Sequence, residues 1–183
     1  TGNLFDEDQK VEEYLLDLEL FGMRFGLARM RRLMTAMGHP ERRFASIHVV
    51  GTYGKTLVSR MTAALLEASG VSAGAYVSPH IVSWRERVLI QGEPISEQAF
   101  DAAMERAEQS AQVADRAAGE EGPVTQFELL TAAAFVAFAE ARVEYAVIEA
   151  GLGGRLDATN VIPSRLTVLT SVSLWSLLVT GGL

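Results

Sequence analysis

The sequence predicts an α/β fold, with a mostly parallel sheet flanked by helices, and three observations lead to this prediction. Short runs rich in β-branched residues alternate with longer segments whose apolar residues recur every three or four positions. The segments between the runs are long enough for the crossovers that parallel strands need. The first run also leads into a glycine turn that contains a lysine, an arrangement typical of nucleotide-binding α/β domains.

Two helices are expected before the first strand. Within residues 6–21 the apolar side chains share one helical face, and they are Val11, Tyr14, Leu15, Leu18 and Phe21. A second helix is expected over residues 27–37. Gly38 and the turn pair His39-Pro40 should end it, because glycine is favoured just past a helix and proline cannot continue one.

The remaining elements follow in alternation. Apolar, β-branched runs that end in turn residues predict strands at 46–50, 73–77, 145–149 and 166–170. Helical spacing between them predicts helices from the turn of residues 51–55 to Gly70, from the N-cap Ser96 to Ala117, and from Thr125 to Ala141. A short extended excursion is expected at residues 88–91, before the turn Gly92-Glu93-Pro94.

Composition limits the function classes. The 183 residues are 49% hydrophobic and 21% charged, which suits one soluble domain. The formal net charge of -7 provides no broad positive field, so we expect no nucleic-acid or membrane partner. Cysteine is absent, which excludes disulfides and thiolate metal sites and fits a cytoplasmic location. The acidic first residues lack a secretory signal, and hydroxyl side chains interrupt the apolar stretch 166–183, so no membrane span is expected.

The glycine turn is the strongest local motif. It reads Gly51-Thr52-Tyr53-Gly54-Lys55-Thr56 between a predicted strand and a predicted helix. Backbone N–H groups at such a helix start attract phosphate, a lysine neutralises the outer phosphates, and a hydroxyl binds Mg²⁺. The predicted nucleotide ligands are Gly51, Thr52, Gly54, Lys55 and Thr56, with Thr56 also a metal ligand. A purely structural turn is the alternative, because the eight-residue P-loop pattern would place glycine where Val49 stands.

Four segments carry a family resemblance. They are IHVVGTYGK, YVSPHIVSWRERVLIQGEPIS, TQFELLTAAAF and VIEAGLGGRLDATNVI. In order and spacing they resemble the signature blocks of folylpolyglutamate and dihydrofolate synthases, members of the Mur ligase superfamily, from about residue 14 to about residue 174. The resemblance implies a P-loop NTPase-like Mur ligase central domain. Residues 1–183 would then be an incomplete N-terminal nucleotide-binding domain without the C-terminal glutamate-ligase domain.

The resemblance also implies an activity. The family uses ATP and Mg²⁺ to add L-glutamate to a folate or dihydropteroate through an acyl-phosphate intermediate, which demands charge neutralisation around the transferred phosphoryl group. We expect the full-length protein to be a monomer and the isolated chain to have weak or no ligase activity. The alternative is a non-catalytic nucleotide-binding or structural module derived from that family.

By motif position, the resemblance implies that Lys55 and Glu128 are catalytic and that Ser78 and Glu128 bind Mg²⁺. It places Asn160 in a loop beside the nucleotide. Ser78 equally fits a strand-end turn when its sequence context is considered alone. Glu128 lies among apolar neighbours, where an unpaired carboxylate is costly.

The substrate side of the resemblance involves His80, Arg85 and Asp157. His80 and Arg85 would meet the substrate, with the arginine suited to carboxylates. An exposed ion-pair loop is the alternative for Arg85. Asp157 would contact substrate or hold the shape of its loop.

The sequence departs from the family pattern in two places. The family loop has asparagine at the position of Tyr53 and small residues at the positions of Thr56 and Leu57. After Leu174 the family continues with Asp-His, and the histidine binds metal, whereas this chain continues with Trp175.

Overall fold

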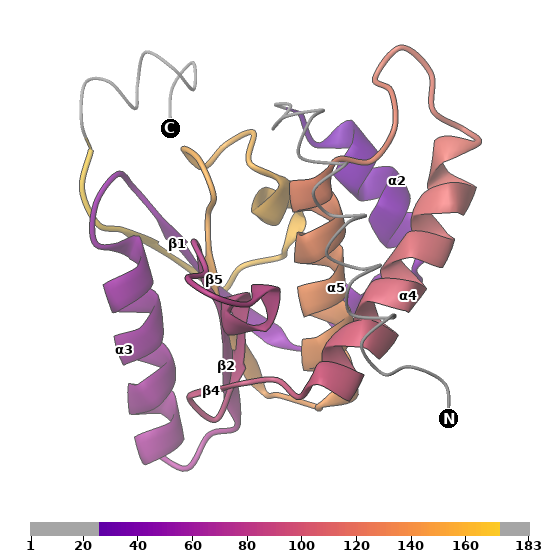
Figure 1. Ribbon diagram of the computed structural model, residues 1–183. Helices are drawn as coiled ribbons and strands as arrows, with labels where there is room; N and C mark the ends of the chain where they lie inside the picture. Colours follow the sequence, from indigo (N-terminus) through magenta and orange to yellow (C-terminus); the bar gives the residue numbers. More distant parts are fainter. Residues whose placement is uncertain (1–25, 173–183) are drawn as a thin grey trace.

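A six-stranded sheet organises residues 26–172, which are the residues that the computed structural model describes (Figure 1). Its strands are β1 (Ala45–Val50), β2 (Ala73–Tyr76), β3 (Val88–Ile90), β4 (Glu93–Pro94), β5 (Tyr145–Glu149) and β6 (Leu166–Leu169). The spatial order is β4-β3-β2-β5-β1-β6. Strands β2, β5, β1 and β6 are parallel, and β3 and β4 extend one edge in antiparallel pairing.

The parallel register brings the strand ends together. Val49 of β1 lies opposite Glu149 of β5 on one side and opposite Val168 of β6 on the other. Tyr76, the last residue of β2, lies opposite Ile148. The loops that follow β1, β2 and β5 therefore leave the sheet at one edge, where α/β proteins usually bind ligands.

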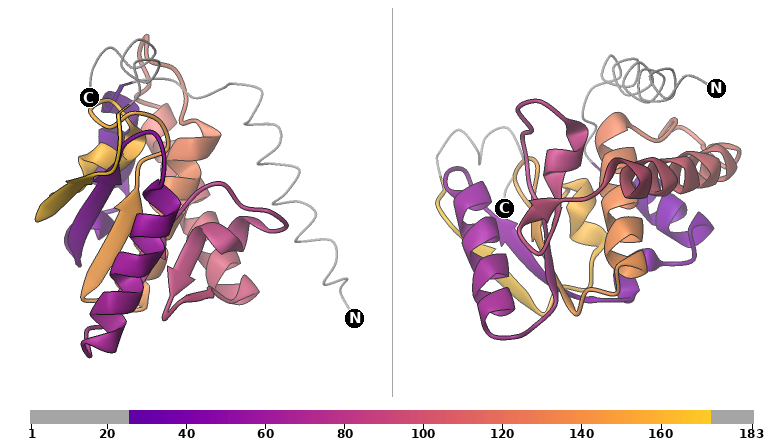
Figure 2. Two further views of the ribbon diagram at one scale, coloured as in Figure 1. Left: turned by 90° about the vertical axis from the view of Figure 1, so that its left-hand side faces the viewer. Right: turned by 60° about the horizontal axis from the view of Figure 1, so that its bottom comes forward.

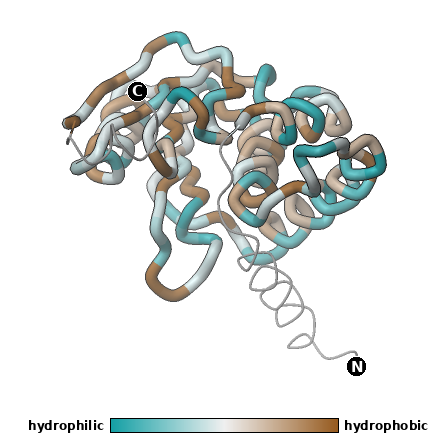
Figure 3. The backbone as a smooth tube through the Cα atoms, turned by 90° about the horizontal axis from the view of Figure 1, so that it is seen from above, coloured by the Kyte–Doolittle hydropathy of each residue, from teal (hydrophilic) through white to brown (hydrophobic). Residues whose placement is uncertain are grey.

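Helices cover both faces of the sheet, as Figures 1 and 2 show. One face carries α3 (Lys55–Ala68), which contacts β1, β2 and β5. The other face carries α5 (Gln126–Glu140), which packs against α4 (Glu97–Asp115) and α2 (Ala28–Ala36). One side of α4 is buried at three- and four-residue spacing, by Phe100, Ala103, Met104, Ala107, Ala111 and Ala114, so its other side is solvated. Figure 3 shows hydrophilic and hydrophobic residues interspersed along the helical coils of the chain.

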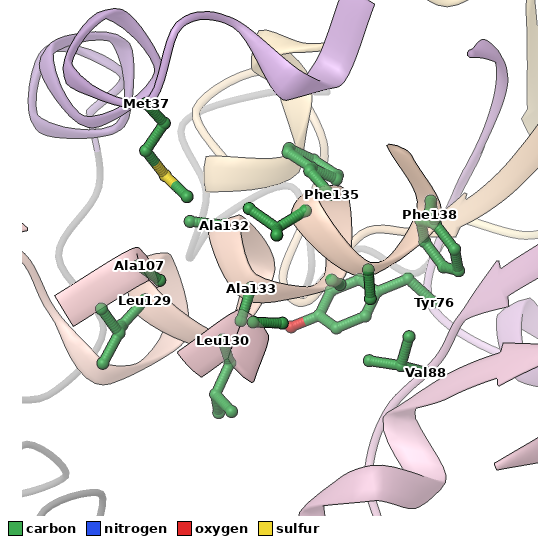
Figure 4. Packing of buried hydrophobic residues seen from close by; sticks show 14 of the residues in the cluster. Met37, Tyr76, Val88, Ala107, Leu129, Leu130, Ala132, Ala133, Phe135 and Phe138 are labelled. Carbon is green, nitrogen blue, oxygen red and sulfur yellow. The ribbon is translucent and has the colours of Figure 1, made fainter. Parts of the chain in front are cut away.

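The central helix α5 is apolar on every side because the sheet and α4 enclose it. Its alanines allow close packing, and its aromatic rings fill the space over the sheet (Figure 4). Phe138 packs edge-on against Phe44, with ring centroids 5.8 Å apart. A Cβ atom at Gly74 of β2 would lie 2.6 Å from the Phe138 ring, so glycine is required where strand and helix approach.

The predicted α/β class is confirmed, and the predicted strands and described helices occur within a few residues of their expected bounds. The excursion at residues 88–91 is in fact the start of the antiparallel pair β3 and β4. Three short 3₁₀ helices, Pro40–Arg42, Trp84–Arg87 and Ala158–Val161, were not predicted, because such short turns have no hydrophobic periodicity. Side chains of Ser83 and Asp157 cap the second and third, whereas the first begins at Pro40 without a side-chain cap. The predicted helix at residues 6–21 and the altered sequence after Leu174 lie outside the described residues. No helix within residues 26–172 has the length and apolarity required to span a membrane.

Candidate functional site

The glycine turn connects β1 directly to α3. Gly54 is the N-cap of α3 in a left-handed conformation, with φ of 80°, and no side chain caps this helix end. The first N–H groups of a helix have no partner within it, so this end presents donors and a positive dipole. At Gly51, φ is 134° and a Cβ atom would lie 2.3 Å from the Thr170 hydroxyl, so only glycine fits there.

Lys55 lies over its own loop. Its Nζ donates hydrogen bonds to the carbonyl oxygens of Gly51, at 3.0 Å, and Thr52, at 3.5 Å. The ammonium group is thus held beside the donors at the start of α3, where it can meet an anion. The arrangement matches what a phosphate-binding loop requires, namely backbone donors and one mobile positive charge.

Oxygen atoms from three elements meet beside this loop. The Thr56 hydroxyl lies 3.0 Å from both the Ser78 carbonyl oxygen and Glu149 Oε1. The Ser78 N–H donates to Glu149 Oε2 at 3.1 Å. Burial raises the pKa of the Glu149 carboxyl above its usual value, although the hydrogen bonds from Ser78 and Thr56 and the charges of Lys55 and Arg87 oppose that shift.

This oxygen set suits a magnesium ion that also binds phosphate. A carboxylate, a hydroxyl and a backbone carbonyl are hard oxygen donors, and Mg²⁺ is usually held by one or two carboxylates together with water and substrate phosphates. Within residues 26–172 no three histidine, cysteine or acidic side chains cluster closely enough to form a metal cage. The carboxylate in the oxygen set beside the loop is that of Glu149, which contacts Thr56 and the predicted ligand Ser78.

Glu128 has different contacts from those expected of a metal ligand. Its carboxylate is buried and accepts hydrogen bonds from Arg29 Nε at 3.0 and 3.1 Å. It also accepts from the backbone and hydroxyl of Thr125, at 2.8 and 2.9 Å, which completes a capping box at the start of α5. These contacts give Glu128 a structural role, and they join α2 to α5.

The sequence analysis missed Glu149 as a metal-ligand candidate. A signal for it exists, because Glu149 is an acidic residue at the end of a buried strand, and the register places that strand beside β1. Sequence alone could not supply this pairing, since β5 is nearly a hundred residues away from β1 along the chain.

The loop after β5 is held by Asp157. Its Oδ2 accepts from the Leu152 N–H at 2.9 Å, and its Oδ1 accepts from the Thr159 N–H at 3.0 Å and hydroxyl at 2.5 Å. Because the hydroxyl of Thr159 donates to Asp157, we assign the proton of the 2.8 Å contact between His48 Nε2 and Thr159 Oγ1 to the imidazole. Burial lowers the pKa of His48, and the nearby Asp157 charge opposes this. Asp157 thus has the contacts of a loop-shaping residue, and Asn160 Nδ2 donates to the Arg155 carbonyl at 3.0 Å in the same loop.

The segment after β2 carries His80 and Arg85. His80 Nδ1 accepts from Arg87 Nε at 3.0 Å, and the His80 and Trp84 rings lie 4.1 Å apart. Arg87 also lies 4.8 Å from the Trp84 ring centroid. Arg85 instead donates to the Ile95 carbonyl at 3.3 Å, so the two predicted substrate residues have different surroundings. Trp84 and Arg87 join His80 in one ring-and-cation cluster that the sequence analysis did not single out as a unit.

Two of the side chains that depart from the family loop pattern, Tyr53 and Leu57, are exposed. Tyr53 is 74% exposed and Leu57 is 64% exposed, so neither fills the space enclosed by the loop. The segment after β6 contacts the loop instead. The Thr52 N–H donates to the Ser171 carbonyl at 2.8 Å, and the Tyr53 N–H donates to the Ser171 hydroxyl at 3.0 Å.

Sequence comparisons identify relatives with a common name. The chain is 39% identical over 170 residues to a dihydrofolate synthase/folylpolyglutamate synthase of Bacillus subtilis, and the match covers 92% of this chain. It is 43% identical over 169 residues to the protein of the same name in Mycobacterium tuberculosis, covering 88% of the chain. It spans only 39% and 35% of these two relatives' lengths. No family model matches the sequence.

Solved structures agree with the sequence matches. The chain is similar to a Mycobacterium tuberculosis folylpolyglutamate synthase complexed with ADP, with a TM-score of 0.86 and 39% identity over 94% of this chain and 38% of that one. It is also similar to Escherichia coli FolC in complex with DHPP and ADP, with a TM-score of 0.79 and 32% identity over 90% of this chain and 38% of that one. These similarities confirm the Mur ligase-type fold that the resemblance implied.

Proposed function

This chain is homologous to folylpolyglutamate and dihydrofolate synthases, and from that premise we propose that it forms the ATP-binding part of a ligase that adds L-glutamate to a folate or dihydropteroate. The observation that carries the proposal is the meeting of the Lys55 loop with Thr56, Ser78 and Glu149 at one edge of the sheet. The chain spans about two-fifths of its relatives' length, so we propose the ligase reaction for the complete protein.

The nucleotide side of the proposal rests on the loop and on the relatives. Solved relatives contain ADP, AMPPCP or both. In this chain the uncapped start of α3 and the Lys55 ammonium supply the donors that ATP phosphates need. Binding of phosphate would draw Lys55 away from the carbonyls of Gly51 and Thr52, which are its partners in the structure described.

Mg²⁺ fits the oxygen cluster. When bound, the ion would neutralise charge on the transferred phosphoryl group. Glu149, the hydroxyl group of Thr56 and the adjacent Ser78 would hold it, and Arg87 adds positive charge near the same carboxylate. Bound metal would favour the ionised Glu149 carboxylate, against the pKa increase that burial causes.

The proposed chemistry is phosphoryl transfer from ATP to the carboxylate of the pterin-linked substrate, followed by attack of the glutamate amine on the acyl phosphate. Lys55 and the first N–H groups of α3 would stabilise the negative charge of the phosphoryl group. Relatives have been solved with folate and with DHPP. The cluster of His80, Trp84 and Arg87 follows β2 at the nucleotide edge and offers rings and a guanidinium to such a substrate. We also propose that the complete protein is a cytoplasmic monomer.

A second candidate is a nucleotide-binding module that does not ligate. The observation in its favour is that the loop N–H groups of Thr52 and Tyr53 already bind Ser171, where a phosphate-binding loop normally keeps donors for its ligand.

One experiment separates the two candidates. The chain is joined to the remaining part of the Mycobacterium tuberculosis relative, and folate-, glutamate- and magnesium-dependent ADP release is measured. The matched control carries that relative's own corresponding segment at the same junction, and a second control carries Lys55→Ala. Turnover that requires Lys55 supports the ligase. If the matched control is active while the chimera binds nucleotide but is inactive, the ligase proposal is rejected and the non-catalytic module is supported.

A further inference from the structure

Four arginines converge on a groove at the end of the sheet opposite the phosphate loop. The groove has a volume of about 890 Å³, and Arg42, Arg43, Arg142 and Arg165 line it. Its lining includes Ala45 and Tyr145, the first residues of β1 and β5, so it lies at the amino ends of the parallel strands. The right-hand view of Figure 2 brings this end of the molecule forward.

The charges in the groove are poorly compensated. Arg42 is paired with Glu41 at 3.4 Å but remains 67% exposed on its side chain. Within residues 26–172, the side chains of Arg43, Arg142 and Arg165 make no ion pair or hydrogen bond. The one lining carboxylate is Glu144, and it accepts a hydrogen bond from the Ser72 N–H at 2.9 Å. Four guanidinium groups beside two carboxylates, Glu144 in the lining and Glu41 on Arg42, stand out in a chain with a net charge of -7.

Arg142 occupies a position where glycine is normally favoured. It follows the C-cap of α5 with φ of 55°, and the Val143 N–H donates to the Phe138 carbonyl at 3.2 Å in a Schellman-type helix end. Glycine is preferred at this left-handed position because a Cβ atom is disfavoured there. The backbone conformation therefore gives no reason for an arginine, and an unfavourable residue at a strained position points to a role of its side chain.

We propose that this groove binds a small molecule bearing several phosphate groups, at a site separate from the phosphate loop. Guanidinium groups match phosphate oxygens with paired hydrogen bonds, and several of them can share one polyphosphate. The groove has the size of a small-molecule site. Its exposed arginines favour a hydrophilic ligand over an apolar one.

An alternative account is that the arginines only compensate the negative end of α5. Cations near a helix C-terminus are stabilising for this reason. The two accounts differ for Arg142→Gly. This change suits the left-handed backbone, so the fold should tolerate it, whereas the groove loses one of its four positive charges.

The test is calorimetric titration with inorganic tripolyphosphate in the presence of EDTA. The titrated protein carries Lys55→Ala, so that the phosphate loop does not contribute. We expect saturable binding with one site, weakened about tenfold by adding either Arg142→Gly or Arg165→Gln, because each removes one charged hydrogen-bonding partner. Arg116→Gln, an equal charge change at the far end of α4, should leave the affinity within about twofold, since exposed charges beyond a Debye length are screened. Urea unfolding of each variant verifies that it is folded.

Three results would overturn the proposal. The first is the absence of saturable binding in the folded Lys55→Ala protein. The second is equal weakening by Arg116→Gln and Arg142→Gly, which would mean a general charge effect. The third is tighter binding of a single-stranded oligonucleotide, with affinity that rises with its length, which would replace the small-molecule ligand by a nucleic acid.

Discussion

Replacing Glu128 by alanine should strongly destabilise the fold. The change removes the buried carboxylate that pairs with Arg29, where the side chains are only 2% and 6% exposed. Breaking a buried ion pair from one side costs about 3–5 kcal/mol because the remaining charge stays buried without its counter-charge. A domain is stabilised by about 5–15 kcal/mol in total, so this loss is a large fraction. With a urea m-value of about 2 kcal/mol/M, the midpoint should fall by about 2 M.

Urea unfolding followed by circular dichroism measures this shift, and the chain offers a matched control. Glu140 pairs with Arg106 on the surface, where both side chains are about half exposed, so Glu140→Ala should change stability by less than about 1 kcal/mol. The double change Arg29→Met with Glu128→Leu should recover much of the loss, because both charges are then removed. A small midpoint shift for Glu128→Ala, combined with loss of magnesium-dependent nucleotide binding, would refute the structural role and favour the metal-ligand prediction.

Three further predictions concern the nucleotide edge of the sheet. The pKa of Glu149 is raised from 4.5, so protonation of its carboxyl stabilises the fold below that pH, and this stabilisation is lost as the pH rises through the folded-state pKa. Glu149→Gln should remove this pH dependence from the urea midpoints, and it should also abolish magnesium-dependent nucleotide binding. Gly51→Ala should cost about 3 kcal/mol, from the positive φ and the overlap with Thr170 and Ser171, and an unchanged midpoint would contradict the loop geometry. The pKa of His48 is lowered from 6.5, so the fold should lose stability as the pH falls from 6.5 through the folded-state pKa. His48→Gln should flatten this part of the curve of urea midpoint against pH, whereas an unaltered curve would rule out His48 as the source of the loss.

The layout of the fold followed from local signals. Short apolar runs marked the strands β1, β2, β5 and β6, and the spacing of apolar residues together with helix-capping residues marked the helices between them. The loop at Gly51 and Gly54 was found because its glycines and Lys55 stand between a strand and a helix.

The contacts of individual acidic residues could not be found in this way. Glu128 and Glu149 both stand among apolar neighbours in the sequence, and only the fold brings one to Arg29 and the other to Thr56 and Ser78. The groove of arginines depended even more on tertiary structure, since residues 42–43, 142 and 165 come from three separate connections. Isolated arginines in a sequence carry no signal of such convergence.

The central claim is that the Lys55 loop and Glu149 together form a MgATP site, and calorimetric titration of this chain with ATP in the presence and absence of Mg²⁺ tests it most directly. We predict one magnesium-dependent site that disappears in folded Lys55→Ala and Glu149→Gln variants. The account would be contradicted if the folded protein did not bind ATP. It would also be contradicted if ATP binding depended on Mg²⁺ but was unaffected by both substitutions.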